Sequence, residues 1–202
     1  MRTIIFSLFF TLFVFTSSVA QTSVMDFFNA RMKAYKAELR KGKITDETPF
    51  QNNKNITVKD IKNGFLRYDL PYAEGFEEMA YYIPTQGNKF AVIASFACGP
   101  ACETDLPTFY ELENGNLVDK TDKYLPKATR EEIKEALTKA ESKIVLSDKD
   151  ASLGMWVKVP QQGTTIFIGF KEDAGISEDG KFHQIYELVY TRANGTFKAV
   201  RK

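Results

Sequence analysis

The segment MAYYIPTQG at residues 79–87 decides the expected fold, because an altered copy, MWVKVPQQG, stands at residues 155–163. The triplet YEL at 110–112 returns at 186–188 with the same offset of 76 residues and no gap. A fixed internal offset is typical of a structural unit that occurs twice. The sequence therefore predicts two related units, with chance similarity as the alternative because the residues between these matches differ.

Each copy has the aromatic and β-branched composition of antiparallel strands. Asn-Gly pairs at 114–115 and 194–195 suit tight hairpin turns, because both residues tolerate positive φ. A further hairpin is predicted over residues 56–70, turning at Asn63-Gly64, and residues 71–78 are expected to be a connection. The other predicted strands are residues 79–83, 90–97, 106–112, 116–120, 143–147, 155–159, 165–170, 183–190 and 196–200.

Two segments, residues 23–40 and 129–141, have apolar residues at helical spacing. Both begin with the spacing of a capping box, in which two side chains satisfy free backbone N–H groups of the first turn. These pairs are Ser23 with Asp26, and Thr129 with Glu132. Each helix therefore has one apolar stripe that needs a partner surface.

Sequential hairpins pair with their neighbours, and each predicted helix then has a sheet face to cover. The expected fold is α+β, a tandem pair of helix-plus-antiparallel-meander units. Their boundaries fall at residues 21–125 and 126–202. The length suits one compact domain that contains both units.

The first 20 residues have the pattern of a signal peptide. Arg2 precedes an apolar run at residues 4–15, and Ser18-Val-Ala20 fits a cleavage site between Ala20 and Gln21. The run is shorter than the roughly 20 residues of a membrane span, so an uncleaved anchor is the less favoured alternative. We expect an exported, soluble protein of the periplasm, the cell surface or the extracellular medium, with no membrane span after signal removal.

Charge and composition narrow the classes of partner. The 27 basic and 26 acidic side chains nearly balance, and no basic stripe stands out, which argues against a nucleic-acid or membrane-surface partner. The 17 Phe and 9 Tyr residues favour strands around a sizeable core. An unknown protein or small molecule is therefore the expected partner.

The stretch CGPAC at residues 98–102 looks like the thioredoxin Cys-Gly-Pro-Cys motif with one residue too many. Cys98 ends a predicted strand instead of opening a helix, so the low thiol pKa of that family is not expected here. A Gly-Pro turn can bring Cys98 and Cys102 within bridging distance, and export favours oxidation. We predict a local disulfide, with metal binding or thiol redox chemistry and free thiols as alternatives. Gly99 and Pro100, in the loop, are candidate contact residues.

Glu111 and Glu187 form a duplicated pair of carboxylates. Two carboxylates brought together by pseudo-symmetry can split their pKa values and act as acid and base. The simpler interpretation is a strand glutamate that faces solvent or pairs with a cross-strand lysine, because Glu111 alternates with Tyr110 and Leu112. His183 is the single histidine, which excludes a multi-histidine metal site and suggests a surface or strand-edge position.

Three aromatic residues, Tyr81, Tyr82 and Trp156, are candidates for a binding surface, although strand aromatics more often belong to a core. No nucleophile, metal or cofactor signature accompanies them. The sequence therefore favours a non-enzymatic exported binding protein, such as an inhibitor or an envelope-associated module. The alternative is a secreted hydrolase that uses Glu111 and Glu187.

Overall fold

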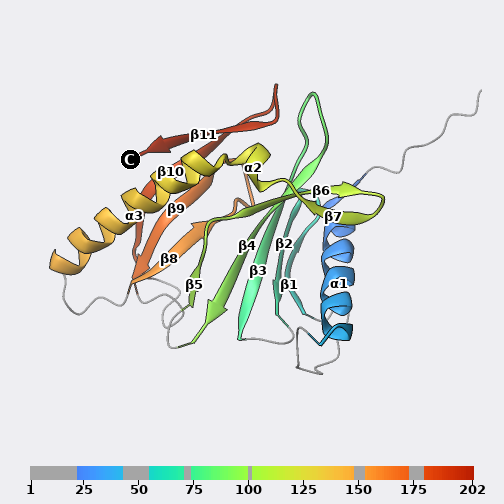
Figure 1. The fold of residues 1–202 in the computed structure, drawn as a ribbon, viewed down its shortest axis with the longest axis horizontal. Coiled ribbons are helices and arrows are strands. Elements are labelled where there is room, and N and C mark those ends of the chain that lie inside the picture. Colours follow the sequence, from blue (N-terminus) through green and yellow to red (C-terminus); the bar gives the residue numbers. More distant parts are fainter. Residues whose placement is uncertain (1–21, 43–54, 71–73, 100–101, 148–152, 173–179) are drawn as a thin grey trace, which may run out of the picture.

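The larger sheet is assembled around β4, its longest strand. The computed structural model describes residues 22–42, 55–70, 74–99, 102–147, 153–172 and 180–202. The strand order of the larger sheet is β1-β2-β3-β4-β6-β7, and β5 also pairs with β4 (Figure 1). Every pairing is antiparallel. The strands are β1 (Ile56–Asp60), β2 (Phe65–Asp69), β3 (Gly75–Tyr82), β4 (Phe90–Cys98), β5 (Cys102–Thr104), β6 (Thr108–Glu113) and β7 (Asn116–Asp119).

The smaller sheet is a four-stranded antiparallel meander with the order β11-β10-β9-β8. A bulge between Gln184 and Tyr186 interrupts the pairing of β10 with β9. The strands of this smaller sheet are β8 (Leu153–Lys158), β9 (Ile166–Glu172), β10 (Phe182–Thr191) and β11 (Thr196–Arg201). With three helices in the described part of the chain, the fold is α+β, as the sequence predicts.

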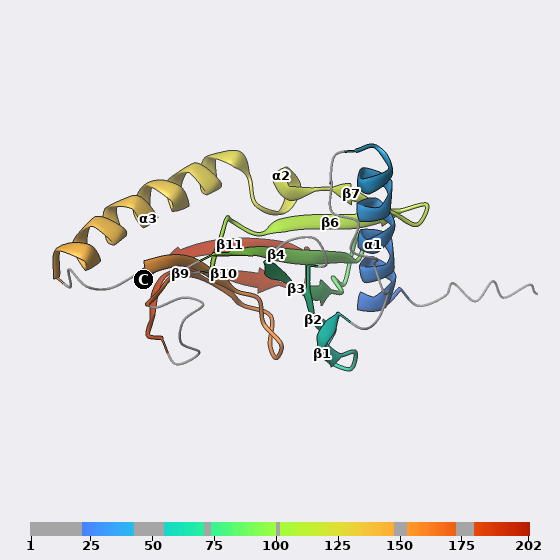
Figure 2. The same ribbon diagram turned by 90° about the horizontal axis from the view of Figure 1, so that it is seen from below.

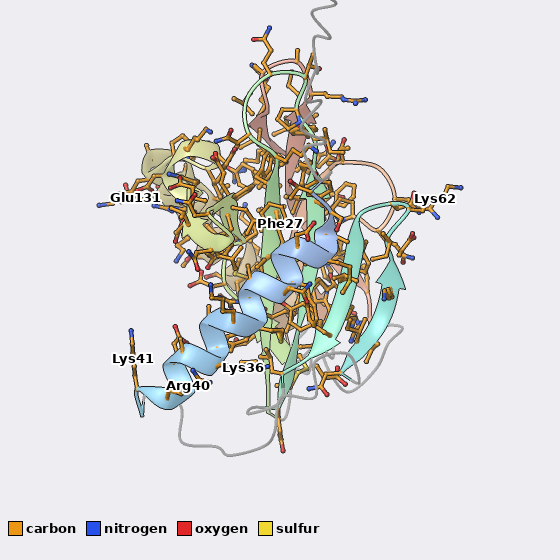
Figure 3. The ribbon with its side chains drawn as sticks, turned by 90° about the vertical axis from the view of Figure 1, so that its right-hand side faces the viewer. Phe27, Lys36, Arg40, Lys41, Lys62 and Glu131 are labelled. Carbon is orange, nitrogen blue, oxygen red and sulfur yellow. A yellow bond between two sulfur atoms is a disulfide. The ribbon has the colours of Figure 1, made fainter. Side chains whose placement is uncertain are left out.

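Helix α1 (Val24–Arg40) covers one face of the larger sheet, and Figure 2 shows it at the opposite end of the molecule from α3. The Asp26 carboxylate accepts the Ser23 N–H at 2.7 Å, the contact expected of a capping box. Figure 3 shows Phe27 on the helix and Arg40 and Lys41 at its far end. The buried residues of this layer are Val24, Phe27, Phe28, Met32, Tyr35, Leu66, Tyr68, Met79, Ala91 and Ile93.

Helix α3 (Lys127–Ser147) follows a short helix α2 (Thr121–Tyr124) and is longer than predicted at both ends. Residues 143–147 were predicted to be a strand, and this is wrong. Ile144 continues the spacing of Ile133, Leu137 and Ala140, and packs with them against the core. The period of the apolar residues therefore extends the helix, which also begins two residues before the predicted cap at Thr129.

The two sheets share one hydrophobic core. Tyr82 and Phe90 of the larger sheet contact Tyr190 and Phe197 of the smaller sheet, with ring centroids 4.9 to 6.1 Å apart. Residues from both sheets and from α3 belong to the same buried cluster. The molecule therefore has a common interior between its two sheets.

Local turn chemistry explains both the successes and the errors of the strand predictions. Asn114 and Gly115 have φ of 51° and 72°, which confirms the tight turn predicted there. Gly64 and Gly195 have positive φ, but the asparagines before them do not, because four residues separate the paired strands at both places. Residues 75–78, predicted to be a connection, belong to β3, where Phe76 and Glu77 are buried.

Candidate functional site

The most promising concavity lies where α3 meets the edges of both sheets. We call it the α3 groove, and its volume is about 540 Å³. Pockets for small ligands usually have volumes of about 300–1,000 Å³, so this groove is large enough to hold a ligand or a partner side chain. Its lining residues are Ser95, Ala97, Glu103, Thr104, Asp105, Lys134, Leu137, Thr138, Glu141, Leu153, Met155 and Phe170.

The floor of the α3 groove is apolar. Met155 and Phe170 pair directly across β8 and β9, so their side chains share the face that α3 covers. Leu137 contributes the helix side, and the hydroxyl of Tyr186 donates to Glu132 of α3 at 3.2 Å. The floor therefore results from strand alternation meeting the apolar stripe of the helix.

The rim of the groove carries more negative than positive groups. Among the described residues, Glu103, Asp105 and Glu141 are exposed there, against the single ammonium of Lys134. Lys134 Nζ lies 3.1 Å from the Asp105 carboxylate. Partial burial acts to raise the pKa of Asp105, but the Leu106 N–H and the Lys134 ammonium lower it below its usual value. The described rim therefore has a formal net negative charge, with three carboxyl groups against one ammonium.

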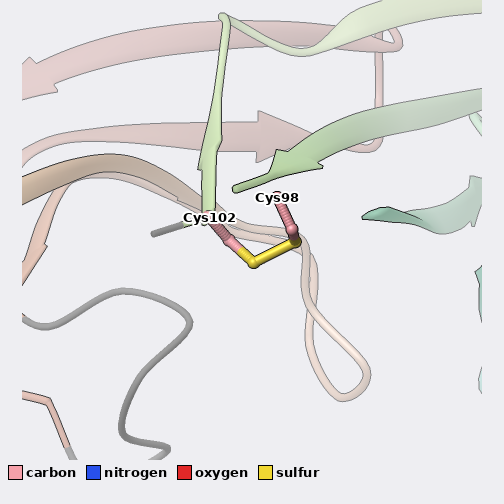
Figure 4. Close-up of a disulfide and its surroundings, with 2 residues drawn as sticks. All are labelled: Cys98 and Cys102. Atoms are coloured by element: carbon pink, nitrogen blue, oxygen red, sulfur yellow. A yellow bond between two sulfur atoms is a disulfide. The ribbon is translucent and has the colours of Figure 1, made fainter. Parts of the chain in front are cut away.

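A disulfide joins Cys98 and Cys102 (Figure 4), directly before Glu103 of the groove in the chain. This confirms the predicted bridge. The two cysteines are direct cross-strand partners at the end of the β4–β5 pair. Glu103 and Thr104 follow the bridge immediately, so it holds their backbone against β4. Gly99 is exposed in the intervening loop, and Pro100 lies outside the described residues, like the predicted signal peptide with its cleavage at Ala20 and Gln21.

Ser95 joins the groove to a buried carboxylate that the sequence did not suggest. Its hydroxyl donates to Glu77 at 2.7 Å, and Glu77 is only 1% exposed. The Arg31 guanidinium of α1 donates to both oxygens of Glu77, at 2.6 and 3.2 Å. Tyr35 donates at 2.5 Å, and the Tyr68 hydroxyl also donates to Glu77.

This cluster is suited to holding α1 on the sheet. Burial acts to raise the pKa of Glu77, but the hydrogen bonds and the charge of Arg31 lower it below its usual value. The Arg31 guanidinium also lies over the Tyr35 ring at 4.4 Å. A carboxylate that is ionised and fully hydrogen-bonded is a poor proton acceptor, so we assign Glu77 a structural role.

The structure places the duplicated carboxylates Glu111 and Glu187 in different settings. Glu111 is buried, and accepts from Asn88 at 2.5 Å, Lys123 at 2.5 Å and Tyr124 at 2.7 Å. Burial acts to raise its pKa, but these donors lower it. The expectation that Glu111 faces solvent is wrong, because α2 covers this face of β6. Glu111 does pair with a lysine, but this is Lys123 of α2 and not a cross-strand residue. Glu187 instead pairs with Lys202 at 2.9 Å.

His183 lies on β10 and contacts the carboxylate of Glu172 at the end of β9. Both side chains are about three-quarters buried, with 21% and 26% exposure. Residues 173–179, which follow Glu172 along the chain, lie outside the described residues. Among the described residues, the surroundings of His183 therefore offer one histidine–carboxylate pair.

The three aromatic candidates do not form one surface. Tyr82 is buried in the shared core, while Tyr81 points to the other face of β3, packs on Phe27 and donates to the Thr22 carbonyl at 2.5 Å. Trp156 lies on β8, an edge strand of the smaller sheet, and its ring centroid lies 4.5 Å from that of Phe96. Only Trp156 remains a candidate for an exposed binding surface.

Sequence reasoning missed the α3 groove. Its floor residues have the pattern of ordinary core residues, and its rim residues that of ordinary surface residues. The nearest signal was the Cys98–Cys102 loop, which lies next to Glu103.

Comparisons with known proteins give no relative. No family model, curated protein or solved structure matches this chain. None of the helices in the described part of the chain combines the length and the apolar character that crossing a membrane requires.

Proposed function

We propose that this chain is an exported, non-enzymatic binding protein that holds its ligand in the α3 groove. The supporting observation is the combination of an apolar floor, formed by Leu137, Met155 and Phe170, with a rim of charged side chains. A concave apolar surface with a few polar groups is the usual form of a ligand site.

The charge of the rim indicates which ligands fit. Three carboxylates face one ammonium, which is itself paired with Asp105. A ligand that places an apolar side chain on the floor and a positive group at the rim has complementary charge. We therefore propose a partner segment with apolar residues next to lysine or arginine.

Several observations favour binding over hydrolysis. No histidine and no cysteine stands among the described residues that line the groove. The buried carboxylates Glu77 and Glu111 have lowered pKa values and several donors each, so neither is suited to act as a base at neutral pH. Glu111 and Glu187 have separate partners, and neither lines the groove.

We also propose that the two sheets derive from a duplicated unit. Strands β3, β4, β6 and β7 and strands β8 to β11 have the same antiparallel order, which supports this origin. The copies differ in register: Met79 pairs with Ile93, whereas Met155 pairs with Phe170, one residue beyond the offset of 76. Export remains a proposal that rests on the pattern of residues 1–20.

A peptide titration tests the groove. The probes are a lysine-flanked Leu-Phe tetrapeptide and its glutamate-flanked counterpart, observed by NMR through the methionine methyl groups. We expect the lysine-flanked peptide to shift the Met155 signal and to leave Met32 of α1 unchanged. Thr138→Trp places a large ring in the groove and should weaken binding about tenfold, a loss of about 1.4 kcal/mol.

Ala128→Trp is the matched control, because Ala128 is exposed on α3 and does not line the groove. This variant should bind as the wild type does. Equal binding of the two peptides would exclude the acidic rim as the selective element. A Met155 signal that neither peptide moves, or equal losses in both variants, would refute the groove as the binding site.

A further inference from the structure

Three cations lie over aromatic rings near the place where Phe76 and Phe96 of the larger sheet contact Trp156 of the smaller sheet. The Arg67 guanidinium lies 3.8 Å from the centroid of Phe76, Lys171 Nζ lies 4.8 Å from Trp156, and Lys158 Nζ lies 4.2 Å from Phe182. We call these six residues the cation–aromatic strip. Its members come from β2, β3, β8, β9 and β10, so both sheets contribute.

The rings give the strip a rigid base. Phe76 stacks on Phe96 with centroids 4.4 Å apart, and Phe96 contacts Trp156 at 4.5 Å. Trp156 therefore packs on the core of the larger sheet and also contacts the Lys171 ammonium. Phe182 is the direct cross-strand partner of Lys171. Two of the three cations, those of Arg67 and Lys171, thus lie over rings that pack in the core.

The strip has more positive charge than its surroundings neutralise. In the described part of the chain, no carboxylate lies within 4 Å of the ammonium of Lys158 or Lys171. Among the described residues, Arg67 pairs with Glu78 at a long 3.9 Å, and the charge of Glu78 also attracts Lys158. Burial raises the pKa of this carboxyl group to about 7, so one partly ionised carboxylate faces three cations. Glu187, which alternation places on the same face of the smaller sheet, is paired with Lys202.

The location of the strip separates it from the α3 groove. Alternation along β8 places Met155 on the face covered by α3 and Trp156 on the opposite face. Lys158 and Lys171 share the face of Trp156, since Lys158 is two residues away and Lys171 pairs with Gly154. A ligand on the strip therefore leaves the α3 groove open.

We propose that the cation–aromatic strip binds an acidic polysaccharide through its carboxylates. A polymer with repeated negative charges suits cations that are spread over strands of both sheets, β2, β8 and β9. An ammonium over an aromatic ring keeps its outward side free for an anion while the ring stabilises it from below.

The same geometry argues against nucleic acid as the occupant. Proteins that bind single strands without sequence preference stack bases on open aromatic faces. Here Trp156 packs on Phe96 and carries Lys171, and Phe182 carries Lys158. A base would have to displace a lysine before it could stack, whereas a carboxylate binds that lysine directly.

The test uses the mature chain and polygalacturonate as the probe, with binding measured by affinity electrophoresis and by the fluorescence of the single tryptophan, Trp156. We expect polygalacturonate to retard the protein in the gel, and this retardation to weaken with added salt. We also expect the emission of Trp156 to change when the carboxylates of the polymer bind the Lys171 ammonium. The double variant Lys158→Gln, Lys171→Gln should bind about tenfold more weakly, through the loss of two exposed ion pairs.

The control is Lys127→Gln with Lys143→Gln, which removes the same charge from exposed positions on α3. It should bind as the wild type does, and both double variants should keep the wild-type urea midpoint. The proposal is overturned if polygalacturonate gives no retardation, if the control loses as much as the strip variant, or if neutral dextran is retained equally. Tighter binding of a single-stranded oligonucleotide or of anionic vesicles would likewise overturn it.

Discussion

Replacing Arg31 by Met should destabilise the protein by more than any exposed ion pair could. The change removes the cation from a carboxylate, Glu77, that is 1% exposed. Breaking a buried pair from one side costs about 3–5 kcal/mol, because the remaining charge is left in a poorly solvated position. Tyr35, Tyr68 and Ser95 still donate to Glu77 in this variant. We therefore expect a loss in the free energy of unfolding at the lower end of this range, about 3 kcal/mol at neutral pH.

The pH dependence distinguishes an electrostatic loss from a simple packing defect. In the wild type the pKa of Glu77 is lowered, so its contribution to stability is present above the unfolded value of 4.5 and is lost as pH falls through the folded value. Without Arg31 the burial effect dominates and raises that pKa. The destabilisation should therefore be largest at neutral pH and should shrink toward pH 4, where Glu77 takes up a proton.

Urea unfolding monitored by Trp156 fluorescence measures both effects, because this ring lies 4.5 Å from Phe96 in the core. Arg130→Met is the matched control: its partner Asp122 is 81% exposed, and the loss should stay below about 1 kcal/mol. An Arg31→Met variant that loses no more stability than the control would refute the assigned role of the cluster. A loss that does not change with pH would show that packing, and not the charge of Glu77, is responsible.

Two further predictions follow from other buried groups. Burial raises the pKa of Glu78 to about 7, so the ionised form destabilises the fold as pH rises above the unfolded value of 4.5. Glu78→Gln should therefore raise the free energy of unfolding at pH 8 by up to about 3 kcal/mol and leave it unchanged at pH 4; equal differences at both pH values in urea titrations would contradict this. The double variant Cys98→Ala, Cys102→Ala opens a ring with a sequence separation of only 4 and should cost about 2 kcal/mol or less. Hydrogen exchange should show faster amides in β5 and unchanged ones in β3, and equal acceleration in both strands would show that the bridge supports the whole sheet.

Local sequence signals were reliable where the structure depends on near neighbours. The Ser23–Asp26 contact, the Asn114-Gly115 turn and the Cys98–Cys102 bridge each depend on residues within four positions of one another. In such patterns the residue types and their spacing are enough to predict the local geometry. Helix α3 shows the limit, because a short apolar run at 143–147 fits a strand and a helix equally well until its neighbours are known.

The burial and the hydrogen-bond partners of the candidate functional side chains could not be predicted from neighbouring residues in the sequence. Glu111 was expected on a solvent-facing side, yet it is buried because α2, reached only after β7, covers that side. Glu77 gave no signal at all, since its ligands Arg31 and Tyr35 are 46 and 42 residues away along the chain. The α3 groove likewise exists only where residues of α3, β5 and β8 converge.

The sequence by itself determined the class of fold, most of its strands, one tight turn and the disulfide, because these depend on periodicity and on short-range chemistry. Tertiary structure alone decided which faces are covered, which carboxylates are ionised in the interior and where a ligand fits. Burial sets the free energy of a charge, and burial depends on chain segments that are distant in sequence. Trp156 illustrates both points. Its residue type suggested a binding role, and only the tertiary structure showed that its ring contacts both Phe96 and the Lys171 ammonium.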